Sequence, residues 1–96
     1  MSQTASPLGF EISVSATDDG TAEAMYIRLA DRKVARTKEI EEGVLLADLD
    51  SRGNLIGIEV LAPVRIRQLI QLVDEPRRRP LQNLIRKTAP EELVLV

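Results

Sequence analysis

"VLLADLDSRGNLIGIEVL", Val44–Leu61, decides the fold, because it places two apolar runs on either side of a tight-turn signal. Asp50 opens and Gly53 closes the segment "DSRG", which is typical of a type I turn followed by a left-handed glycine in a β-hairpin. Ala47 is expected opposite Ile56, and Glu59 opposite about Val44. Alternation then predicts an apolar face of Leu45, Ala47, Leu49, Ile56, Ile58 and Val60, and a half-apolar face of Val44, Leu46, Asp48, Leu55, Gly57, Glu59 and Leu61.

The same stretch has the spacing of a calcium-binding loop, with acids at places one and three, glycine at six and Glu59 at twelve. Its fifth place, however, is the cation Arg52, and its flanks lack a helical period. In the predicted hairpin Asp48 and Glu59 lie about four residues apart, on the order of 13 Å, whereas calcium ligands converge to ~2.4 Å from one ion. The sequence therefore predicts a turn between strands and no metal.

Three further segments alternate between apolar and polar residues and are predicted to be strands. They are "FEISVSA" at 10–16, "AMYIRLA" at 24–30 and "VARTKEI" at 34–40. The third is the most polar, and its charges suit a sheet edge, where they discourage unwanted pairing.

After Ala62 the apolar period changes to that of a helix. Pro63 suits a first turn and Pro76 is expected to end the helix, whose stripe is Val64, Ile66, Leu69, Ile70 and Val73. "DEPRRRP" is expected to be a polar break, and "PLQNLIRK" to form two more helical turns. The predicted fold is α+β: an antiparallel β-meander of about five strands, followed by one or two C-terminal helices packed on one sheet face.

The predicted organisation has three parts. Residues 1–8 are expected to be a flexible lead-in, residues 9–75 a domain of meander plus helix, and residues 76–96 a basic linker, a short helix and an apolar tail.

The composition excludes several kinds of site. The 96 residues include no Cys and no His, so zinc sites of the usual kinds, thiol nucleophiles and histidine-based acid–base pairs are absent. With one Phe, one Tyr and no Trp, an aromatic platform for stacking bases is not expected. No cofactor is expected. No apolar run approaches the roughly 20 residues of a membrane span, and a cytoplasmic location is expected.

Charge is divided unevenly along the chain. Residues 1–62 carry six basic and eleven acidic residues, whereas residues 63–90 carry seven basic residues against Asp74 and Glu75. The candidate contact residues for a phosphate or a partner are Arg77, Arg78, Arg79, Arg86 and Lys87. Alternatives are a solvated linker, an acidic protein partner and nucleic acid, although a pI of about 5.1 argues against general DNA affinity.

The tail is a second candidate contact surface. An exposed run of β-prone apolar side chains invites aggregation, so the tail is expected to join a sheet edge in its own chain or in a second copy. Exchange between copies would produce a homodimer. The candidate strand-exchange residues are Leu93, Val94, Leu95 and Val96.

The segment "YIRLADRKVARTKEIEEGVLLADLDSRGNLIGIEVL", Tyr26–Leu61, resembles the YuzE-like family of small bacterial domains of unknown function. Together with the strand from Phe10, the resemblance extends to Leu61. It implies a compact β-rich domain with a trailing helix and no established activity. Some relatives look like companions of toxin-like proteins, which implies an antitoxin or accessory role.

The sequence thus favours a small, homodimeric, cytoplasmic protein-interaction or regulatory module over an enzyme, with an antitoxin-like role as one form of it. Asp48, Glu59 and Glu11 are the candidate carboxylates for an acid–base pair, and nothing in the sequence places two of them across a cleft. The alternative is a nucleic-acid-binding regulator that uses Arg77–Arg79.

Overall fold

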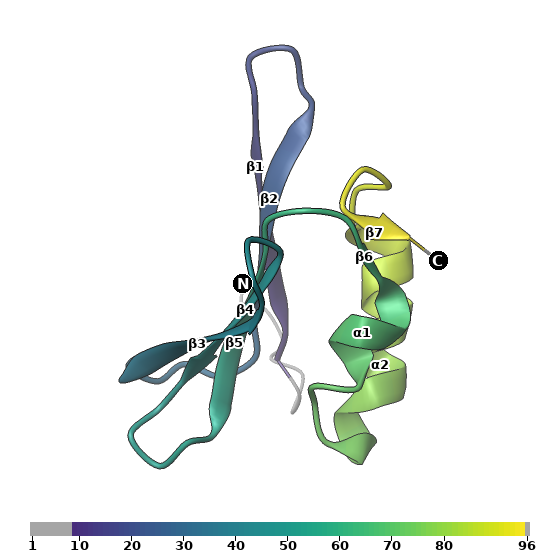
Figure 1. Cartoon of the computed structure of the whole chain (residues 1–96). Coiled ribbons are helices and arrows are strands. Elements are labelled where there is room, and N and C mark those ends of the chain that lie inside the picture. Colours follow the sequence, from purple (N-terminus) through teal and green to yellow (C-terminus); the bar gives the residue numbers. More distant parts are fainter. Residues whose placement is uncertain (1–8, 96) are drawn as a thin grey trace, which may run out of the picture.

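A five-stranded antiparallel sheet is built from most of the first 60 residues (Figure 1). The computed structural model describes residues 9–95. Its strands are β1 (Glu11–Ala16), β2 (Ala22–Arg28), β3 (Arg36–Glu41), β4 (Leu45–Leu49) and β5 (Leu55–Val60). The predicted α+β class is confirmed. The strand order is β1-β2-β5-β4-β3, which differs from a simple meander because β5 inserts between β2 and β4.

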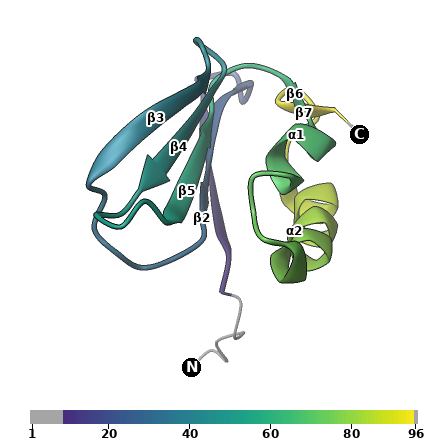
Figure 2. The ribbon, with the colours of Figure 1, turned by 60° about the horizontal axis from the view of Figure 1, so that its bottom comes forward.

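The remaining elements form a second layer beside the sheet. They are β6 (Val64–Arg65), α1 (Ile66–Ile70), α2 (Glu75–Thr88) and β7 (Val94–Leu95). Figure 2 shows both helices on the same side of the sheet. The core lies between the layers and is lined by one face of the central strands, whereas every residue of the edge strand β3 is exposed. The buried residues of the core are Met25, Ile27, Leu29, Leu45, Ile58, Val60, Val64, Ile66, Leu69, Val73, Leu81, Ile85, Leu93 and Val94.

The hairpin between β4 and β5 is confirmed, and strands rather than helices flank its turn. Gly53 has a φ of +85°, the left-handed conformation expected of it, and its amide donates to the Asp50 carbonyl at 3.0 Å. The register differs from the predicted one: Ala47 pairs with Ile58, two residues beyond Ile56. A register shift between Asp48 and Leu49 accompanies this pairing, so Leu55 packs against the core instead of lying on the half-apolar face.

The helical region differs from its prediction in two respects. The first helix is only Ile66–Ile70, because Val64–Arg65 is extended and pairs with the tail. The predicted break "DEPRRRP" is instead the start of α2, with Pro76 in its first turn. The physical reason is that proline is tolerated where an amide needs no helical partner, and arginine is a good helix former.

Residues 76–95 contribute side chains to the main core. Helix α2 begins at Glu75, across the predicted boundary, and contributes Leu81 and Ile85 to the core. Leu93 and Val94 are buried in the same cluster. The predicted lead-in at 1–8 and the tail residue Val96 lie outside the described residues. Across residues 9–95, no helix is both long and apolar enough to cross a membrane.

Candidate functional site

The face of the sheet that the helices leave uncovered carries a hydrogen-bonded arrangement of polar side chains. We call it the open face. Its strand residues alternate with the core residues, and cross-strand pairing arranges most of them in two rows. The first row is Ser13, Tyr26, Glu59, Leu46 and Glu39, and the second is Glu11, Arg28, Gly57, Asp48 and Thr37.

Tyr26 connects three strands of this face. Its hydroxyl donates a hydrogen bond of 2.9 Å to Oδ2 of Asp48, and Thr37 donates one of 2.6 Å to Oδ1 of the same carboxylate. To reach β4 from β2, the phenol passes over Gly57 of β5. A Cβ at Gly57 would collide with the phenol oxygen, so only glycine leaves room for this path. Both carboxylate oxygens of Asp48 are therefore occupied from within the sheet.

The electrostatics of the open face keep Tyr26 protonated. Burial, followed by the hydrogen bond to Asp48 and the charge of that carboxylate, raises the pKa of Tyr26 from 10.0 to about 12. A phenol with this pKa is a hydrogen-bond donor at neutral pH and is poorly matched to proton transfer there. The arrangement is suited to holding a surface in shape for binding.

Asp48 and Glu59, the carboxylates of the calcium-like spacing, are closer in register than predicted. Asp48 pairs with Gly57, two residues before Glu59, where the sequence suggested about four. Asp48 is occupied by Tyr26 and Thr37, whereas Glu59 stands in the neighbouring row. In the part of the chain that the structure describes, no three Asp or Glu side chains gather in a way that could hold a metal ion.

Helix α2 places the three arginines of the run, Arg77–Arg79, in different environments. Arg77 pairs with Asp74, and the hydrogen bond from Arg77 lowers the pKa of that carboxyl. Arg78 donates to the Val73 carbonyl at 3.0 Å. Only Arg79 is both exposed and free of a described ion pair or hydrogen bond. The predicted three-arginine patch is therefore not a single surface.

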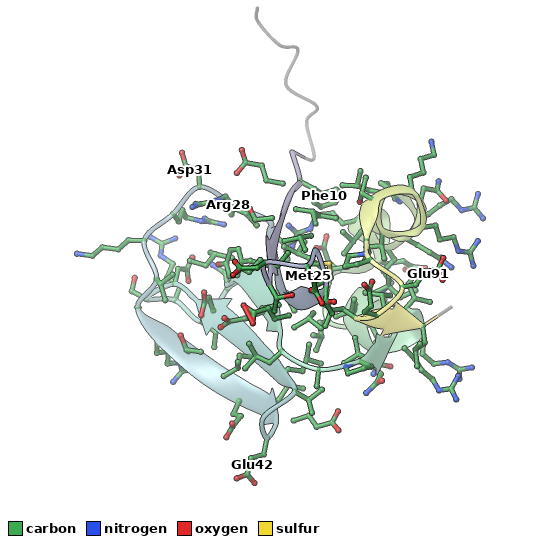
Figure 3. All side chains as sticks on the ribbon, turned by 90° about the horizontal axis from the view of Figure 1, so that it is seen from above. Phe10, Met25, Arg28, Asp31, Glu42 and Glu91 are labelled. Carbon is green, nitrogen blue, oxygen red and sulfur yellow. The ribbon has the colours of Figure 1, made fainter. Side chains whose placement is uncertain are left out.

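Arg79 instead joins the basic residues near the C-terminal end of α2. Residues at i, i+4, i+7 and i+8 share a helix face, and we call the set at positions 79, 83, 86 and 87 the basic stripe. The side chains opposite it, Leu81 and Ile85, are buried in the core. Figure 3 shows side chains that end in nitrogen projecting from the helical side, away from the sheet. The exposed members of the stripe are Arg79, Asn83, Arg86 and Lys87.

The tail pairs with its own chain. β7 lies parallel to β6, with Val64 opposite Val94, and the Val64 amide donates to the Leu93 carbonyl at 2.9 Å. Leu93 and Val94 are 3% and 6% exposed, while Leu95 is 46% exposed. Exchange of the tail between copies stays a prediction, and it would have to break this pairing.

Sequence reasoning missed the contact of Tyr26 with Asp48. These residues stand on strands that are not adjacent in the sheet, and only the insertion of β5 brings them together. One signal was available: a glycine inside an apolar strand often marks the close approach of another group. Gly57 is such a residue.

The middle of the chain is similar in sequence to a family without an assigned activity. Residues 19–62 match the family model described as "Protein of unknown function (DUF2283)", and this stretch runs from the turn before β2 to the end of the sheet. The chain is similar to that family over this region, which includes Tyr26, Thr37, Asp48 and Gly57. No match to a curated protein or to a solved structure was found.

Proposed function

We propose that this protein is a protein-interaction module, not an enzyme, and that its basic stripe binds an acidic surface of a partner protein. The observation that carries the proposal is the division of the arginines along α2. Arg77 and Arg78 are engaged within the chain, whereas Arg79, Arg86 and Lys87 are exposed together on the outward face.

The distribution of charge favours a partner that contacts one side of the molecule. The open face carries the acids Glu11, Glu39, Asp48 and Glu59 against a single cation, Arg28, which already pairs with Glu11. A long polyanion that wrapped around the chain would meet these carboxylates. A partner docked on α2 alone would meet cations, and charge complementarity at that surface would give specificity and a fast association rate.

The test is affinity capture from the native source with three forms of the protein, followed by mass identification. The stripe variant is Arg79→Ser with Arg86→Ser. The matched control is Arg36→Ser with Lys38→Ser, which removes the same charge from the exposed edge strand β3. We expect one protein with an acidic contact surface to be retained by the wild type and the control but lost from the stripe variant. Equal retention by all three forms would contradict the proposal.

Nucleic acid is the second candidate, because the same stripe presents three cations along one helix. Treating the capture with nuclease separates the two cases, since a partner held through nucleic acid would be released. Gel-shift titrations with duplex DNA and with RNA at low salt measure the rival directly. If it holds, binding should weaken steeply with salt, and the stripe variant should flatten that dependence. Absence of binding at low salt would eliminate it.

We also infer that two copies associate through the open face, which would give a homodimer by another route than the tail exchange expected from the sequence. Support comes from Tyr26, from half-buried Leu46 and from Leu61, which is 39% exposed beyond the end of β5. Aromatic residues are enriched at such interfaces. Leu46→Glu should convert the dimer to a monomer in light scattering, whereas Leu95→Glu should not. A monomeric wild type would exclude the dimer. An antitoxin-like role, which the family resemblance implies, would be one form of such a module.

A further inference from the structure

A hollow of about 530 Å³ lies at the end of the sheet, between the connection from β2 to β3 and the turn of the β4–β5 hairpin. It is distant in the sequence from the basic stripe. Its lining combines three cations, one acid, a hydroxyl and two small apolar side chains. The lining residues are Arg32, Lys33, Val34, Ala35, Asp50, Ser51 and Arg52.

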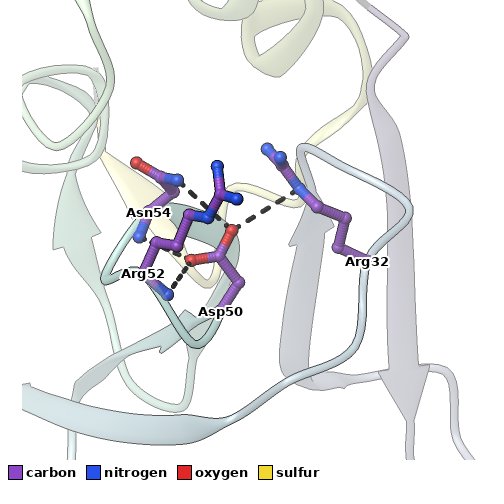
Figure 4. A network of polar contacts seen from close by, with 4 residues as sticks. All are labelled: Arg32, Asp50, Arg52 and Asn54. Atoms are coloured by element: carbon purple, nitrogen blue, oxygen red, sulfur yellow. Dashed lines mark hydrogen bonds and ion pairs between the residues drawn. The ribbon is translucent and has the colours of Figure 1, made fainter.

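The single acid of the hollow is already satisfied by the chain. Asp50 is 8% exposed and accepts hydrogen bonds of 2.9 Å from the amides of Arg52 and Asn54. The Asn54 side-chain amide donates at 3.3 Å, and Nε of Arg32 lies 3.6 Å from Oδ2 (Figure 4). These donors, led by the Asn54 amide, lower the pKa of Asp50 and keep it a carboxylate. Asp50 therefore fixes the turn and positions Arg32.

The cations of the hollow are not satisfied in the same way. The Arg32 side chain is 57% exposed, and its contact with Asp50 uses only Nε, so its terminal nitrogens remain free to bind. Lys33 and Arg52 are exposed, and within residues 9–95 neither side chain forms an ion pair. Figure 4 shows the guanidinium groups of Arg32 and Arg52 extending to the same side of the Asp50 carboxylate. Positive charge is thus in excess.

We propose that this hollow binds a small organic phosphate monoester. Arg32 and Arg52 would hold the phosphate oxygens, since guanidinium groups bind phosphate in a bidentate manner, and Lys33 would add charge. A phosphate alone would leave most of the volume empty, whereas Val34 and Ala35 provide an apolar wall for the organic part. The stretch with the spacing of a calcium-binding loop would then bind an anion, because the acid at its third place, Asp50, is buried and its fifth place is the cation Arg52.

The test is calorimetric titration of the full chain at low salt with four probes: inorganic phosphate, adenosine 5′-monophosphate, ribose 5-phosphate and adenosine. We expect both esters to bind more tightly than inorganic phosphate, and adenosine not to bind. A preference for the nucleotide would assign the apolar wall to a base, and equal affinity of the two esters would assign it to the sugar. Adenosine binding as tightly as its phosphate, or no saturable binding of any probe at millimolar concentration, would overturn the proposal.

Variants separate this site from general attraction to cations. Arg52→Gln and Arg32→Gln should each weaken binding of the better ester by at least about tenfold, because each removes charge-assisted hydrogen bonds. Arg36→Gln, on the exposed edge strand, is the matched control and should leave the affinity unchanged. Should Arg32→Gln disturb the turn, Arg52→Gln still decides, since the Arg52 side chain makes no described contact with Asp50. Equal weakening by the control would contradict a defined site.

Discussion

The hydroxyl of Tyr26 on β2 donates to Asp48 on β4 at 2.9 Å, although β5 lies between the two strands. The contact exists because Gly57 of β5 has no side chain at the point where the phenol crosses. Tyr26 thus contacts both β5 and β4, and this arrangement of the open face requires glycine at position 57.

We predict that Gly57→Ala destabilises the protein by about 1–3 kcal/mol, since the added methyl group displaces the Tyr26 ring and breaks its bond to Asp48. In a Tyr26→Ala background the same change should cost less than about 0.5 kcal/mol, because residues in contact are not additive. Urea unfolding of the four proteins in this double-mutant cycle measures the coupling. Additive costs would show that Gly57 does not act through Tyr26.

The ionisation of Tyr26 can be followed without interference, because the chain contains one Tyr and no Trp. We predict that tyrosinate absorbance reports a pKa of about 12 in the folded protein and of about 10 in urea. Asp48→Asn should lower the folded value while leaving it above 10, since burial is the largest cause of the shift. Glu59→Gln, which removes the smallest of the raising contributions, should have less effect. A folded value near 10 would contradict the geometry.

The same shift predicts how stability depends on pH. Because the pKa of Tyr26 is higher in the folded protein, its contribution is fully present below about pH 10 and is lost as the pH rises toward 12. Tyr26 is partly exposed, so solvent screening reduces this contribution to about 1 kcal/mol. Urea unfolding at about pH 9 and pH 11 should therefore show a larger loss for the wild type than for Tyr26→Phe. Equal losses would mean that Tyr26 adds nothing to the alkaline instability.

The alternation of apolar and polar residues predicted which face of each central strand is buried. Met25, Ile27 and Leu29 recur with period two between polar neighbours, and all three are buried. Gly53 was likewise readable, because only glycine favours the left-handed position of that turn. Local rules of this kind depend on neighbouring residues alone.

The register of β4 with β5 could not be obtained in the same way. The turn already places Leu49 opposite Leu55, one residue beyond the predicted partner, and the irregularity between Asp48 and Leu49 adds a second residue. Leu55 thereby packs against the core. The place of β5 between β2 and β4 also depends on long-range packing. The contacts of Tyr26 depend on both features. The alternation of apolar and polar residues therefore could not predict the hydrogen bond from Tyr26 to Asp48, although it placed both residues on the polar face of their strands.

Helix α2 differs from its prediction because Pro76 was expected to end one helix and Pro80 to begin another. Pro76 lies in the first turn of α2, and Pro80 lies inside the helix. Pro80 has no amide hydrogen to donate to the Pro76 carbonyl, and its ring crowds that carbonyl. We therefore predict that Pro80→Ala raises the free energy of unfolding by about 1–3 kcal/mol and increases the helical circular dichroism.

The control for Pro80→Ala is Gln82→Ala in the same helix, which should change stability by less than about 0.5 kcal/mol. Both are measured by urea unfolding under identical conditions. A loss of stability in Pro80→Ala would indicate that the packing of the ring, which is half-buried, outweighs the missing hydrogen bond.

The paired tail gives a prediction that separates closure within one chain from exchange between copies. Leu93 is buried and Leu95 is exposed, so Leu93→Ala should cost about 2–4 kcal/mol and Leu95→Ala less than about 0.5 kcal/mol. If the tail closes on its own chain, the cost of Leu93→Ala is the same at all protein concentrations. An exchanged tail would couple that cost to association, and the unfolding midpoint would then rise with concentration even in a Leu46→Glu background, which removes association through the open face. Thermal unfolding across a hundredfold range of concentration decides between them, with light scattering of the chain shortened after Glu92 as an independent measure of association.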